Sequence, residues 1–419
     1  MEKKRYPSFN WFKLPLWQQI FIALILGIIA GLVFKEKILV LQPVGVLFIR
    51  AIHMIIVPVL FFSIINAFLS VNDVRSMRRI AGKAVVLYAI CMLLAAISGI
   101  LAATLLGAGK EAHFFVNGAT DLGAIQQGGL NLRSFVENLI PENPVMAFST
   151  GNVVQILVFA IIFGVAMNRT QETAVPVAQF CRSCFDVVIK LALIVMSFAP
   201  YGVFALIAGV MGQYGFHALL PLMKFIGSVY LGCFGMLIFY GVVLYVVCGE
   251  SPLHFFKCIL TPLLTAFTTA SSAATMPVTL KSAEEQLKIN PVYSRFLIPL
   301  GVSLNLNGVS IYLSAAAVFA ANVYGIHLGM EQYITMVGLI VLTAMGAAGV
   351  PGSAVVVMGA VQSAVGIPLG MLPLIAGVDR FNDMVQTATS VAGDLFATRL
   401  ISSLEKHSVP EELEELEEV

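Results

Sequence analysis

The residues best suited to chemistry lie close to the C-terminus, inside an otherwise apolar stretch. Asp379, Arg380, Asp383, Asp394 and Arg399 all fall within the segment GVDRFNDMVQTATSVAGDLFATRLIS. A charge at the centre of a membrane-spanning helix costs about 2.5–3.5 kcal/mol on insertion scales, so several together predict a polar cavity. Because a helix turns by about 100° per residue, polar side chains here form a stripe on one face. The stripe consists of Asp383, Thr387, Ser390 and Asp394.

The oxygen atoms of this stripe are suited to cations. Hard metal ions prefer oxygen ligands, and an ammonium group needs an acceptor such as a carboxylate. Gln386 and Asp379 flank the stripe on one side, and Arg380 flanks it on the other. In a purely structural alternative, Arg380 and Asp383 neutralise each other within a helix bundle, but that leaves Asp394 unexplained.

A second polar interruption occurs in the segment LGVSLNLNGVSIY, at Asn305, Asn307 and Gly308. Asparagine carbonyls and unwound backbone can coordinate Na⁺. Hydrogen bonding between helices is the simpler use of such side chains. Together with the carboxylate stripe, the pattern favours cation binding.

Two further segments are rich in small residues where a lipid-facing helix would carry Leu, Ile and Val. They are Thr265–Pro277, which reads TAFTTASSAATMP, and Gly346–Ser353, which reads GAAGVPGS. Gly and Pro interrupt helices, and backbone freed at membrane depth must be buried in protein or line a water-filled cavity. We therefore expect two re-entrant helical hairpins, at about 252–285 and 330–365, with packing of small residues between helices as the alternative.

The two small-residue segments also share a setting. Pro277 precedes Asn305 by the same number of residues as Pro351 precedes Asp379. This spacing indicates an internal repeat. Paired interrupted segments in two halves of a chain point to the binding site of a transporter.

The composition places the chain in a membrane. Of 419 residues, 59% are hydrophobic and 11% are charged, whereas a soluble domain carries about 25% charged residues. The 24 basic and 23 acidic residues create no field that would attract nucleic acid. Cys181 and Cys184 have a CxxC spacing but no second pair to complete a zinc or redox site.

Apolar stretches of membrane-spanning length recur along the chain, and we expect about eight spans in an all-α protein. Basic residues gather at the N-terminus and again between Arg75 and Lys83. The positive-inside rule places both groups in the cytoplasm, and we expect both termini there, in the plasma membrane of the cell. The end of the chain, 406–419, is predicted to be a solvated acidic tail. The apolar stretches are Ile20–Phe34, Val44–Leu69, Ala84–Leu106, Val153–Met167, Val187–Val210, Phe225–Val247, Phe296–Val323, Met336–Met358 and Leu369–Leu404, the last broken by charges.

These motifs together resemble the dicarboxylate/amino acid:cation symporter family, which includes the excitatory glutamate transporters. The segment SSAATMP is similar to the serine-rich tip of the family's first hairpin, and GAAGVPG to the second tip. NLNGVS stands where the family has an Asn-Met-Asp-Gly-Thr motif. DRFNDMVQTATSVAGD resembles the last helix of the family, which binds substrate and sodium.

The resemblance implies a homotrimer of eight transmembrane helices and two re-entrant hairpins per protomer, arranged as inverted repeats. A scaffold for trimerisation would comprise 12–70 and 130–215. A transport domain, comprising 78–108 and 220–405, would slide through the membrane as an elevator. The expected partners are membrane lipid and a small-molecule substrate, and no enzymatic activity or catalytic residue is expected.

The resemblance also assigns roles to individual positions. Asp383 would bind the substrate's amino group, with Thr387 beside it. Ser272 and the backbone of the segment from Val350 to Gly352 would close over the substrate's carboxylate. One sodium ion would lie at Asp394 and the backbone oxygens of Gly301, Asn305 and Ser390. A second would lie near the carbonyl groups of Ser303, Ala344, Met345 and Ala347.

The predicted substrate follows from the positions at which this chain departs from the family pattern. Glutamate-type members have Arg at the position of Gln386 and Thr at that of Val309, and both touch the substrate's side-chain carboxylate. Losing the guanidinium removes a bidentate partner for that carboxylate. A third sodium site of the family uses an Asp where this chain has Asn307. Tyr88 of that site remains, whereas Cys91 and Met92 replace its hydroxyl ligands.

We therefore expect a Na⁺-coupled symporter of a small neutral amino acid that uses fewer sodium ions than glutamate-type members. A first alternative is a proton- or sodium-coupled carrier of glutamate, aspartate or a C4-dicarboxylate, in which Arg380 replaces the missing Arg. A second alternative is a sensor or anion channel that kept the fold but lost coupling. The retained Asp383 and Asp394 favour a transporter over the second alternative.

Overall fold

The structure is a computed structural model that describes residues 16–70, 78–112, 140–150, 153–215, 219–345 and 353–405. These residues form helices and short connections, and no strand occurs among them. The helices of the first half are α1 (Leu16–Phe34), η2 (Lys35–Leu41), α2 (Gln42–Ser70), α3 (Arg78–Leu106), α5 (Pro144–Thr150), α6 (Val153–Thr170), η6 (Gln171–Ala174), α7 (Val175–Ser197), α8 (Ala199–Tyr214) and α9 (Leu219–Cys248). Those of the second half are α10 (Pro252–Thr269), α11 (Ser272–Glu285), α12 (Pro291–Leu304), α13 (Asn307–Tyr324), α14 (Met330–Met345), α15 (Ser353–Ala364), η8 (Leu369–Met371) and α16 (Leu372–Leu404).

Within the described residues, three helical segments are long and apolar enough to cross a membrane, namely Arg79–Leu106, Leu220–Cys248 and Pro291–Tyr324. A fourth would be the pair Val175–Val195 and Ala199–Gln213, which is bent by 48°. These helices agree with a membrane protein. The total of eight spans, the orientation and the re-entrant depth of the hairpins remain predictions.

The bend between α7 and α8 corrects one expectation. The apolar stretch Val187–Val210 reads as a single span, yet the helix ends at Ser197 and restarts at Ala199. Pro200 stands in the first turn of α8. A proline there lacks an N–H for the preceding turn and restricts the residue before it, so the two helices meet at an angle. Hydrophobicity alone does not reveal this break.

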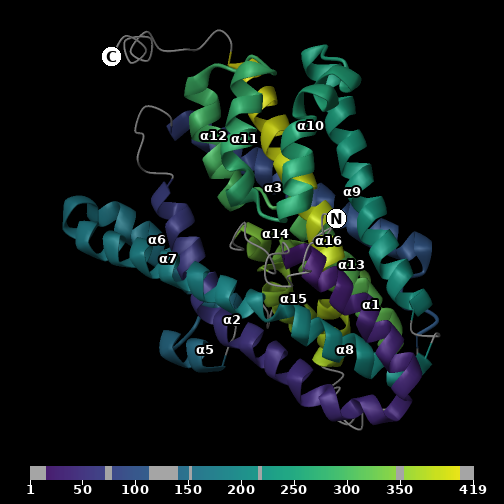
Figure 1. The fold of residues 1–419 in the computed structure, drawn as a ribbon. Coiled ribbons are helices and arrows are strands. Elements are labelled where there is room, and N and C mark those ends of the chain that lie inside the picture. Colours follow the sequence, from purple (N-terminus) through teal and green to yellow (C-terminus); the bar gives the residue numbers. More distant parts are fainter. Residues whose placement is uncertain are drawn as a thin grey trace, which may run out of the picture.

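The predicted first hairpin is present as two helices that pack side by side. α10 and α11 are joined only by Ala270 and Ser271. The Ser282 hydroxyl of α11 donates a hydrogen bond of 2.6 Å to the carbonyl of Cys258 on α10, which holds the two arms together. Figure 1 shows these helices next to α12 and the yellow α16. The second expected hairpin has its arms in α14 and α15, and its tip, 346–352, lies outside the described residues.

Glycines allow the N-terminal helix α1 to lie directly on α8. A Cβ atom at Gly31 would come within 2.6 Å of the carbonyl oxygen of Ala208, so only glycine fits this contact. At Gly27 the corresponding distance to the carbonyl of Phe204 is 3.0 Å. Such small residues at a helix crossing are typical of packing between membrane helices.

The long helix α16 is the centre of the second half of the chain. Its 33 residues form one continuous helix, so the charges do not interrupt it as they interrupt the apolar pattern. It contacts α9, α10, α11, α12, α13 and α15. Because neighbouring helices surround it, Asp379, Asp383 and Asp394 are each less than a tenth exposed. The helix therefore carries its carboxylates inside the protein, and not toward lipid.

Candidate functional site

The carboxylate stripe of α16 faces the break between α12 and α13. The amide nitrogen of Asn305 donates a 2.9 Å hydrogen bond to Oδ1 of Asp394. One turn earlier on α16, the hydroxyl of Ser390 accepts a 3.0 Å bond from the backbone N–H of Gly308. The two polar interruptions found in the sequence therefore contact each other in the structure. At the break itself, Asn305 and Leu306 separate two helices that would otherwise form one span.

Asp394 and Asn305 leave two buried oxygens available for a cation. Neither Oδ2 of Asp394 nor Oδ1 of Asn305 has a hydrogen-bond partner among the residues that the structure describes. Buried acceptors without partners are costly, so a ligand that satisfies them would stabilise the site. An oxygen-rich pair with one negative charge matches Na⁺ in hardness and charge.

Gly301 explains how Asp394 reaches this position. A Cβ atom at Gly301 would lie 2.5 Å from Oδ1 of Asp394, so a larger residue would displace the carboxylate. A similar close approach occurs at Gly308, where a Cβ atom would lie 2.0 Å from the carbonyl oxygen of Gln386. Both glycines therefore let α12 and α13 contact the polar face of α16 directly.

Asp383 lies where α16 approaches the tip of the first hairpin. The Thr387 hydroxyl donates a hydrogen bond of 3.4 Å to Oδ1 of Asp383. Nη1 of Arg380 lies 3.6 Å from Oδ2 of Asp383. The Arg380–Asp383 pair of the structural alternative is therefore present, but as one long contact and not as a bidentate pair.

The guanidinium of Arg380 also reaches the first hairpin. Its Nη2 donates a 3.2 Å hydrogen bond to the carbonyl of Thr269, the last residue of α10. A cation is favourable at the carbonyl end of a helix. Its Nε and Nη1 have no hydrogen-bond partner within the described part of the chain. Arg380 thus connects Asp383 to the hairpin tip, and it still has N–H groups that make no hydrogen bond.

The tip of the first hairpin has a strained and well-capped geometry. Ala270 adopts a left-handed conformation, with φ 50° and ψ 40°. Conformations of this kind in residues other than glycine are uncommon and cluster at functional sites. Ser271 caps α11, because its hydroxyl accepts a 3.2 Å bond from the N–H of Ala274. Ser272 is then the first residue of α11, with its backbone at the positive end of that helix, where carboxylates bind well.

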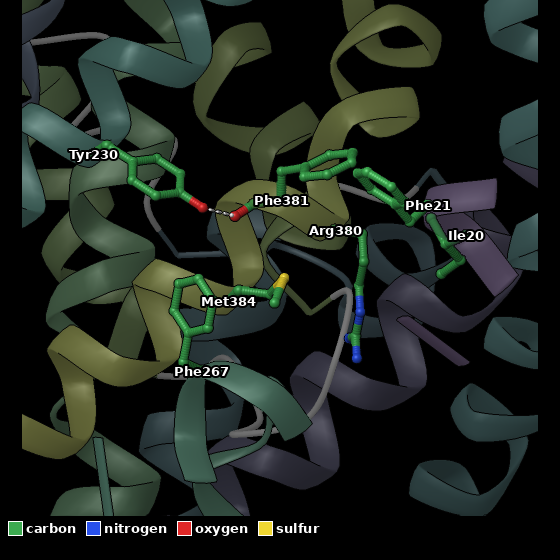
Figure 2. Close-up of a pocket in the computed structure, with 7 residues that line it drawn as sticks. All are labelled: Ile20, Phe21, Tyr230, Phe267, Arg380, Phe381 and Met384. Carbon is green, nitrogen blue, oxygen red and sulfur yellow. Dashed lines mark hydrogen bonds between the residues drawn. The ribbon is translucent and has the colours of Figure 1, made fainter. Parts of the chain in front are cut away.

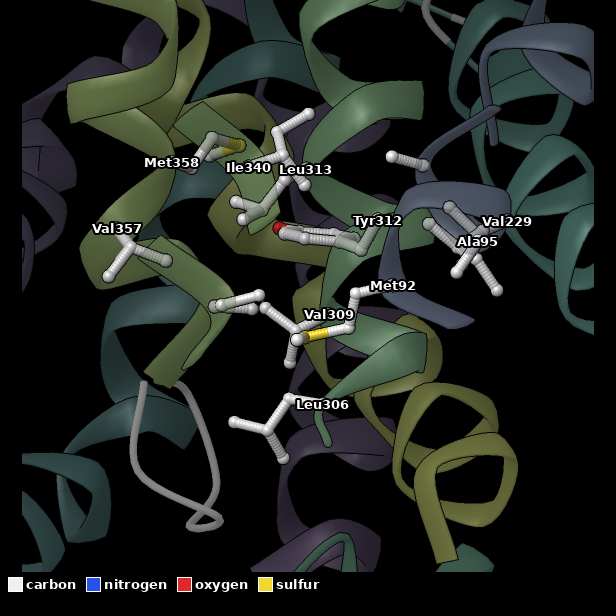
Figure 3. Close-up of a cluster of buried hydrophobic side chains, with 14 of the residues drawn as sticks. Met92, Ala95, Val229, Leu306, Val309, Tyr312, Leu313, Ile340, Val357 and Met358 are labelled. Atoms are coloured by element: carbon white, nitrogen blue, oxygen red, sulfur yellow. The ribbon is translucent and has the colours of Figure 1, made fainter. Parts of the chain in front are cut away.

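The opposite flank of the stripe contains Gln386 and Val309. Gln386 is 1% exposed, and neither atom of its amide group has a hydrogen-bond partner within the described ranges. Val309 belongs to a buried hydrophobic cluster that also contains Met92 and Met358 (Figure 3). Gln386 and Val309 therefore bring no charge to this flank, part of which is hydrophobic core, whereas Asp379 places a buried carboxyl group on it.

Sequence reasoning missed several buried polar groups near this flank. Both amide atoms of Asn382 have no hydrogen-bond partner in the described ranges, and the buried Tyr312 hydroxyl interacts with the carboxyl group of Asp379, which the sequence had already singled out. Gln362 of α15 is fully buried with the same lack of partners. A charge in an apolar segment is a visible signal, whereas a single Tyr, Asn or Gln there is not. Only the structure identifies these groups as candidates for contact with a ligand.

In the region of the predicted lost sodium site, neutral groups hydrogen-bond to one another, although Oδ1 of Asn307 has no hydrogen-bond partner in the described ranges. The Tyr88 hydroxyl donates a 2.9 Å hydrogen bond to the carbonyl of Leu297. The Asn307 amide donates a 2.8 Å bond to the hydroxyl of Tyr240, a residue that the sequence did not single out. Cys91 and Met92 are buried and apolar. Where the family has a charged ligand, this chain thus uses an amide in a tyrosine hydrogen bond.

Arg399 takes part in an ion pair away from the stripe. Its Nε lies 2.6 Å from Oε2 of Glu250, which follows α9, and the Glu250 side chain is 8% exposed. Lys83 forms an ion pair with Glu405 at the end of α16. These ion pairs attach α16 to α9 and α3, so a structural role explains the charge of Arg399 in an apolar segment.

Only some of the remaining residues predicted to bind sodium or substrate lie within the described part of the chain. Ser303 and Met345 are partly buried and Ala344 is fully buried, on α12 and α14. Val350, Gly352 and Ala347 lie outside the described residues. The second sodium site therefore remains a prediction, as does closure of the second hairpin over the substrate.

Comparison with known proteins identifies the family of the chain. Residues 16–404 match the sodium:dicarboxylate symporter family. A proton/sodium-glutamate symport protein of Bacillus caldotenax is 34% identical over 404 residues, which is 94% of this chain and 95% of that protein. A C4-dicarboxylate transport protein of Laribacter hongkongensis is 32% identical over 400 residues, covering 93% and 89% respectively. A proton/glutamate-aspartate symporter of Bacillus subtilis is 32% identical over 391 residues, covering 93% and 94%.

These findings confirm the resemblance drawn from the sequence motifs. They do not support the expected neutral substrate, since these relatives are named for the transport of glutamate, aspartate or C4-dicarboxylates. They fit the alternative of an acidic substrate better, and they agree with cation coupling and a membrane location. From its sequence over nearly the whole length and from the polar site on α16, the chain belongs to the sodium:dicarboxylate symporter family.

Proposed function

We propose that this protein carries an acidic amino acid across the membrane, coupled to the entry of a cation. The observation that carries the proposal is the pair formed by Asp383 and Arg380, two buried side chains of opposite charge held 3.6 Å apart. An amino acid with a second carboxylate presents both signs of charge to such a pair. Asp383 would bind the ammonium group, and Arg380 would bind one carboxylate.

Arg380 is suited to this role because some of its N–H groups make no hydrogen bond. Its Nε and Nη1 lack hydrogen-bond partners among the residues described, and both are buried. N–H groups of a guanidinium that make no hydrogen bond can donate to a carboxylate. The single long contact with Asp383 would be exchanged for contacts with the substrate. The relatives named for glutamate symport support this choice of substrate.

Sodium is the cation that the site favours. Asp394 and Asn305 contribute unpartnered oxygens inside the protein, at the break between α12 and α13. Broken helices in transporters provide backbone carbonyls for Na⁺ in this way. We assign Asp394, Asn305, Gly301 and Ser390 to this ion. Proton coupling is the alternative, and substitution of the external cation separates the two.

A neutral amino acid is a second candidate, favoured by Gln386. A buried neutral amide with both atoms unpartnered can pair with a carboxamide or hydroxyl side chain of a substrate. It would pair less strongly with a carboxylate than an arginine would. The buried carboxylate of Asp379, four residues before Asp383, would also disfavour a second negative charge on that flank.

The test is uptake of radiolabelled substrates into proteoliposomes under an imposed Na⁺ gradient or an imposed pH gradient. L-Glutamate, L-aspartate, L-serine, L-alanine and succinate are compared. We expect the acidic amino acids to be taken up best, and Arg380→Gln to reduce their uptake relative to serine. Preferred uptake of serine or alanine would establish the second candidate. Preferred uptake of succinate would show that no ammonium group is required.

We further propose that the chain works as a homotrimer with an elevator movement. α1, α2 and α5–α8 would form the scaffold, and α3 together with α9–α16 would form the moving part. The support is the family, together with the packing of α1 on α8 and of α16 among α9–α13, with α16 also contacting α8 across the proposed boundary. Native mass spectrometry in detergent gives the oligomeric state. Cysteine pairs placed across α1 and α16 would cross-link in one state of the transport cycle and not in the other.

A further inference from the structure

A cavity of ≈ 180 Å³ lies between α1 and the helices that carry the candidate site. α1, α9, α10 and α16 all contribute to its wall. Figure 2 shows Ile20 and Phe21 of α1 facing the other lining side chains. The lining residues are Ile20, Phe21, Tyr230, Phe267, Arg380, Phe381 and Met384.

The wall of this cavity is hydrocarbon in character. The Tyr230 hydroxyl donates a 3.0 Å hydrogen bond to the carbonyl of Phe381, so the ring of Tyr230 faces the cavity. The nitrogens Nε and Nη1 of Arg380 are fully covered, so this residue lines the cavity with its aliphatic stem. An ordered water needs two to four polar partners, and an apolar cavity without them stays dry. The cavity is therefore suited to an apolar occupant.

The cavity lies beside an exposed apolar surface of α1. Phe21 is 45% exposed, whereas its neighbour Ile20 is 1% exposed and points inward. Phe21 stacks edge-on against Phe381 of α16, with ring centroids 5.7 Å apart. Further along α1, the apolar side chains of Ile25, Leu26 and Ile29 are each at least 40% exposed. In a membrane these residues contact acyl chains, so the cavity is continuous with the hydrocarbon of the bilayer.

From this continuity we propose that the end of an acyl chain from a bilayer lipid occupies the cavity. An apolar cavity of about 150 Å³ binds benzene, so this one accepts about six carbon atoms of a chain. The gain comes from contacts with aromatic and aliphatic walls that would otherwise lack partners. The occupant lies between α1 and the segment Arg380–Met384 of α16, next to Asp383.

This placement gives the lipid chain an influence on transport. It fills the space between α1 and α16, and it packs along the stem of Arg380, whose guanidinium contacts the hairpin tip. The occupied cavity therefore supports the position of Arg380. The influence on uptake rests on the proposed function, whereas the binding of the chain does not.

Photolabelling tests the binding without any substrate. The full-length protein is reconstituted in vesicles of phosphatidylcholine that carries a diazirine at the end of one acyl chain, and is then irradiated. Mass spectrometry should find label on peptides that contain Ile20, Phe267 or Met384. A second lipid, with the diazirine next to the glycerol, should leave these peptides unlabelled.

Two variants fill the cavity from opposite walls, Ile20→Phe on α1 and Met384→Phe on α16. Either one should remove the label from the peptide that contains Phe267, while Leu26→Phe, on the exposed face of α1, should retain it. Equal thermal unfolding of each variant and the unmodified protein controls for misfolding. Label on exposed α1 residues alone, with none on Phe267, would overturn the proposal. Label that persists in both filling variants would overturn it as well.

Uptake measurements then address the influence on transport. In the filling variants we expect a change in the maximal rate of uptake with little change in the substrate concentration for half-maximal rate. If labelling behaves as expected and uptake of every substrate is absent in the unmodified protein, the proposed function fails while the lipid site stands. If uptake is normal and labelling is absent, the lipid site alone fails.

Discussion

Two adjoining buried polar regions near the α12–α13 break differ in the kind of polar group that they contain. Along the stripe, Asp383 and Asp394 hold their carboxyl groups inside the protein, and Oδ2 of Asp394 has no hydrogen-bond partner among the residues described. Around Asn307, by contrast, an amide and two tyrosine hydroxyls donate neutral hydrogen bonds or accept them. Oδ1 of Asn307 is likewise without a hydrogen-bond partner among the residues described, so the two regions differ in having or lacking carboxyl groups, and not in being fully satisfied.

The comparison indicates which region retains function. Keeping a charge away from water is expensive unless it is paired, so an unpaired carboxylate is retained only where something binds it. A neutral hydrogen bond contributes about 1 kcal/mol and needs no ligand. We therefore interpret the stripe as the binding region and the Tyr88–Asn307 region as structure that has replaced a cation site.

Loss of Asp383 is the strongest test of this comparison. Removing one partner of a buried charge contact costs about 3–5 kcal/mol, which is more than about a hundredfold in affinity. Asp383→Asn should therefore abolish amino-acid uptake in proteoliposomes. Asp186→Asn, the same change at an exposed position on α7, serves as the matched control and should leave uptake intact. Uptake that survives in the Asp383 variant would mean that the substrate has no amino group.

Loss of Asp394 comes next and tests the cation. Asp394→Asn removes the negative charge that offsets dehydration of Na⁺, so the dependence of substrate affinity on sodium should disappear. Isothermal titration of substrate at several NaCl concentrations measures this. A Hill coefficient cannot exceed the number of sites, and for the unmodified protein we expect about two or less. A stoichiometry of three sodium ions per substrate would refute the interpretation of the Asn307 region, and indifference to sodium would favour protons.

Gln386→Arg should have a smaller effect, on selectivity. A guanidinium on this flank adds a bidentate partner for a carboxylate and neutralises part of the field of Asp379. The ratio of aspartate to serine affinity should rise by about tenfold, corresponding to about 1.4 kcal/mol. Gln386→Glu is the matched control, with the opposite charge, and should lower the ratio. An unchanged ratio in both variants would place the flank outside the substrate pocket.

The smallest effects are expected in the Asn307 region. Tyr240→Phe removes the acceptor of the Asn307 amide and should lower stability by about 1–3 kcal/mol, since a buried donor is left unsatisfied. Thermal unfolding in detergent measures the change. The sodium dependence of substrate binding should be unaltered in this variant and in Asn307→Ala. A strong loss of sodium dependence would show that this region still binds a cation.

The sequence by itself determined the class of protein and the residues at its centre. The scarcity of charge predicts a membrane protein, because lipid is the only solvent for such a surface. Carboxylates in an apolar segment, the Asn-rich break and the first small-residue tip each indicated the elements that the structure brings together. Intramembrane charges are so costly that they are visible without any knowledge of the fold.

Tertiary structure decided what those residues contact. The sequence could not show that Asn307 pairs with Tyr240, that Arg399 pairs with Glu250, or that Arg380 reaches the carbonyl of Thr269. Each of these contacts joins helices far apart in the chain, and neutral Tyr and Asn residues leave no periodic or charge signal. The apolar cavity between α1 and α16 likewise has no signature in the sequence. It results from how the side chains of four helices pack, and packing is decided only when those helices meet.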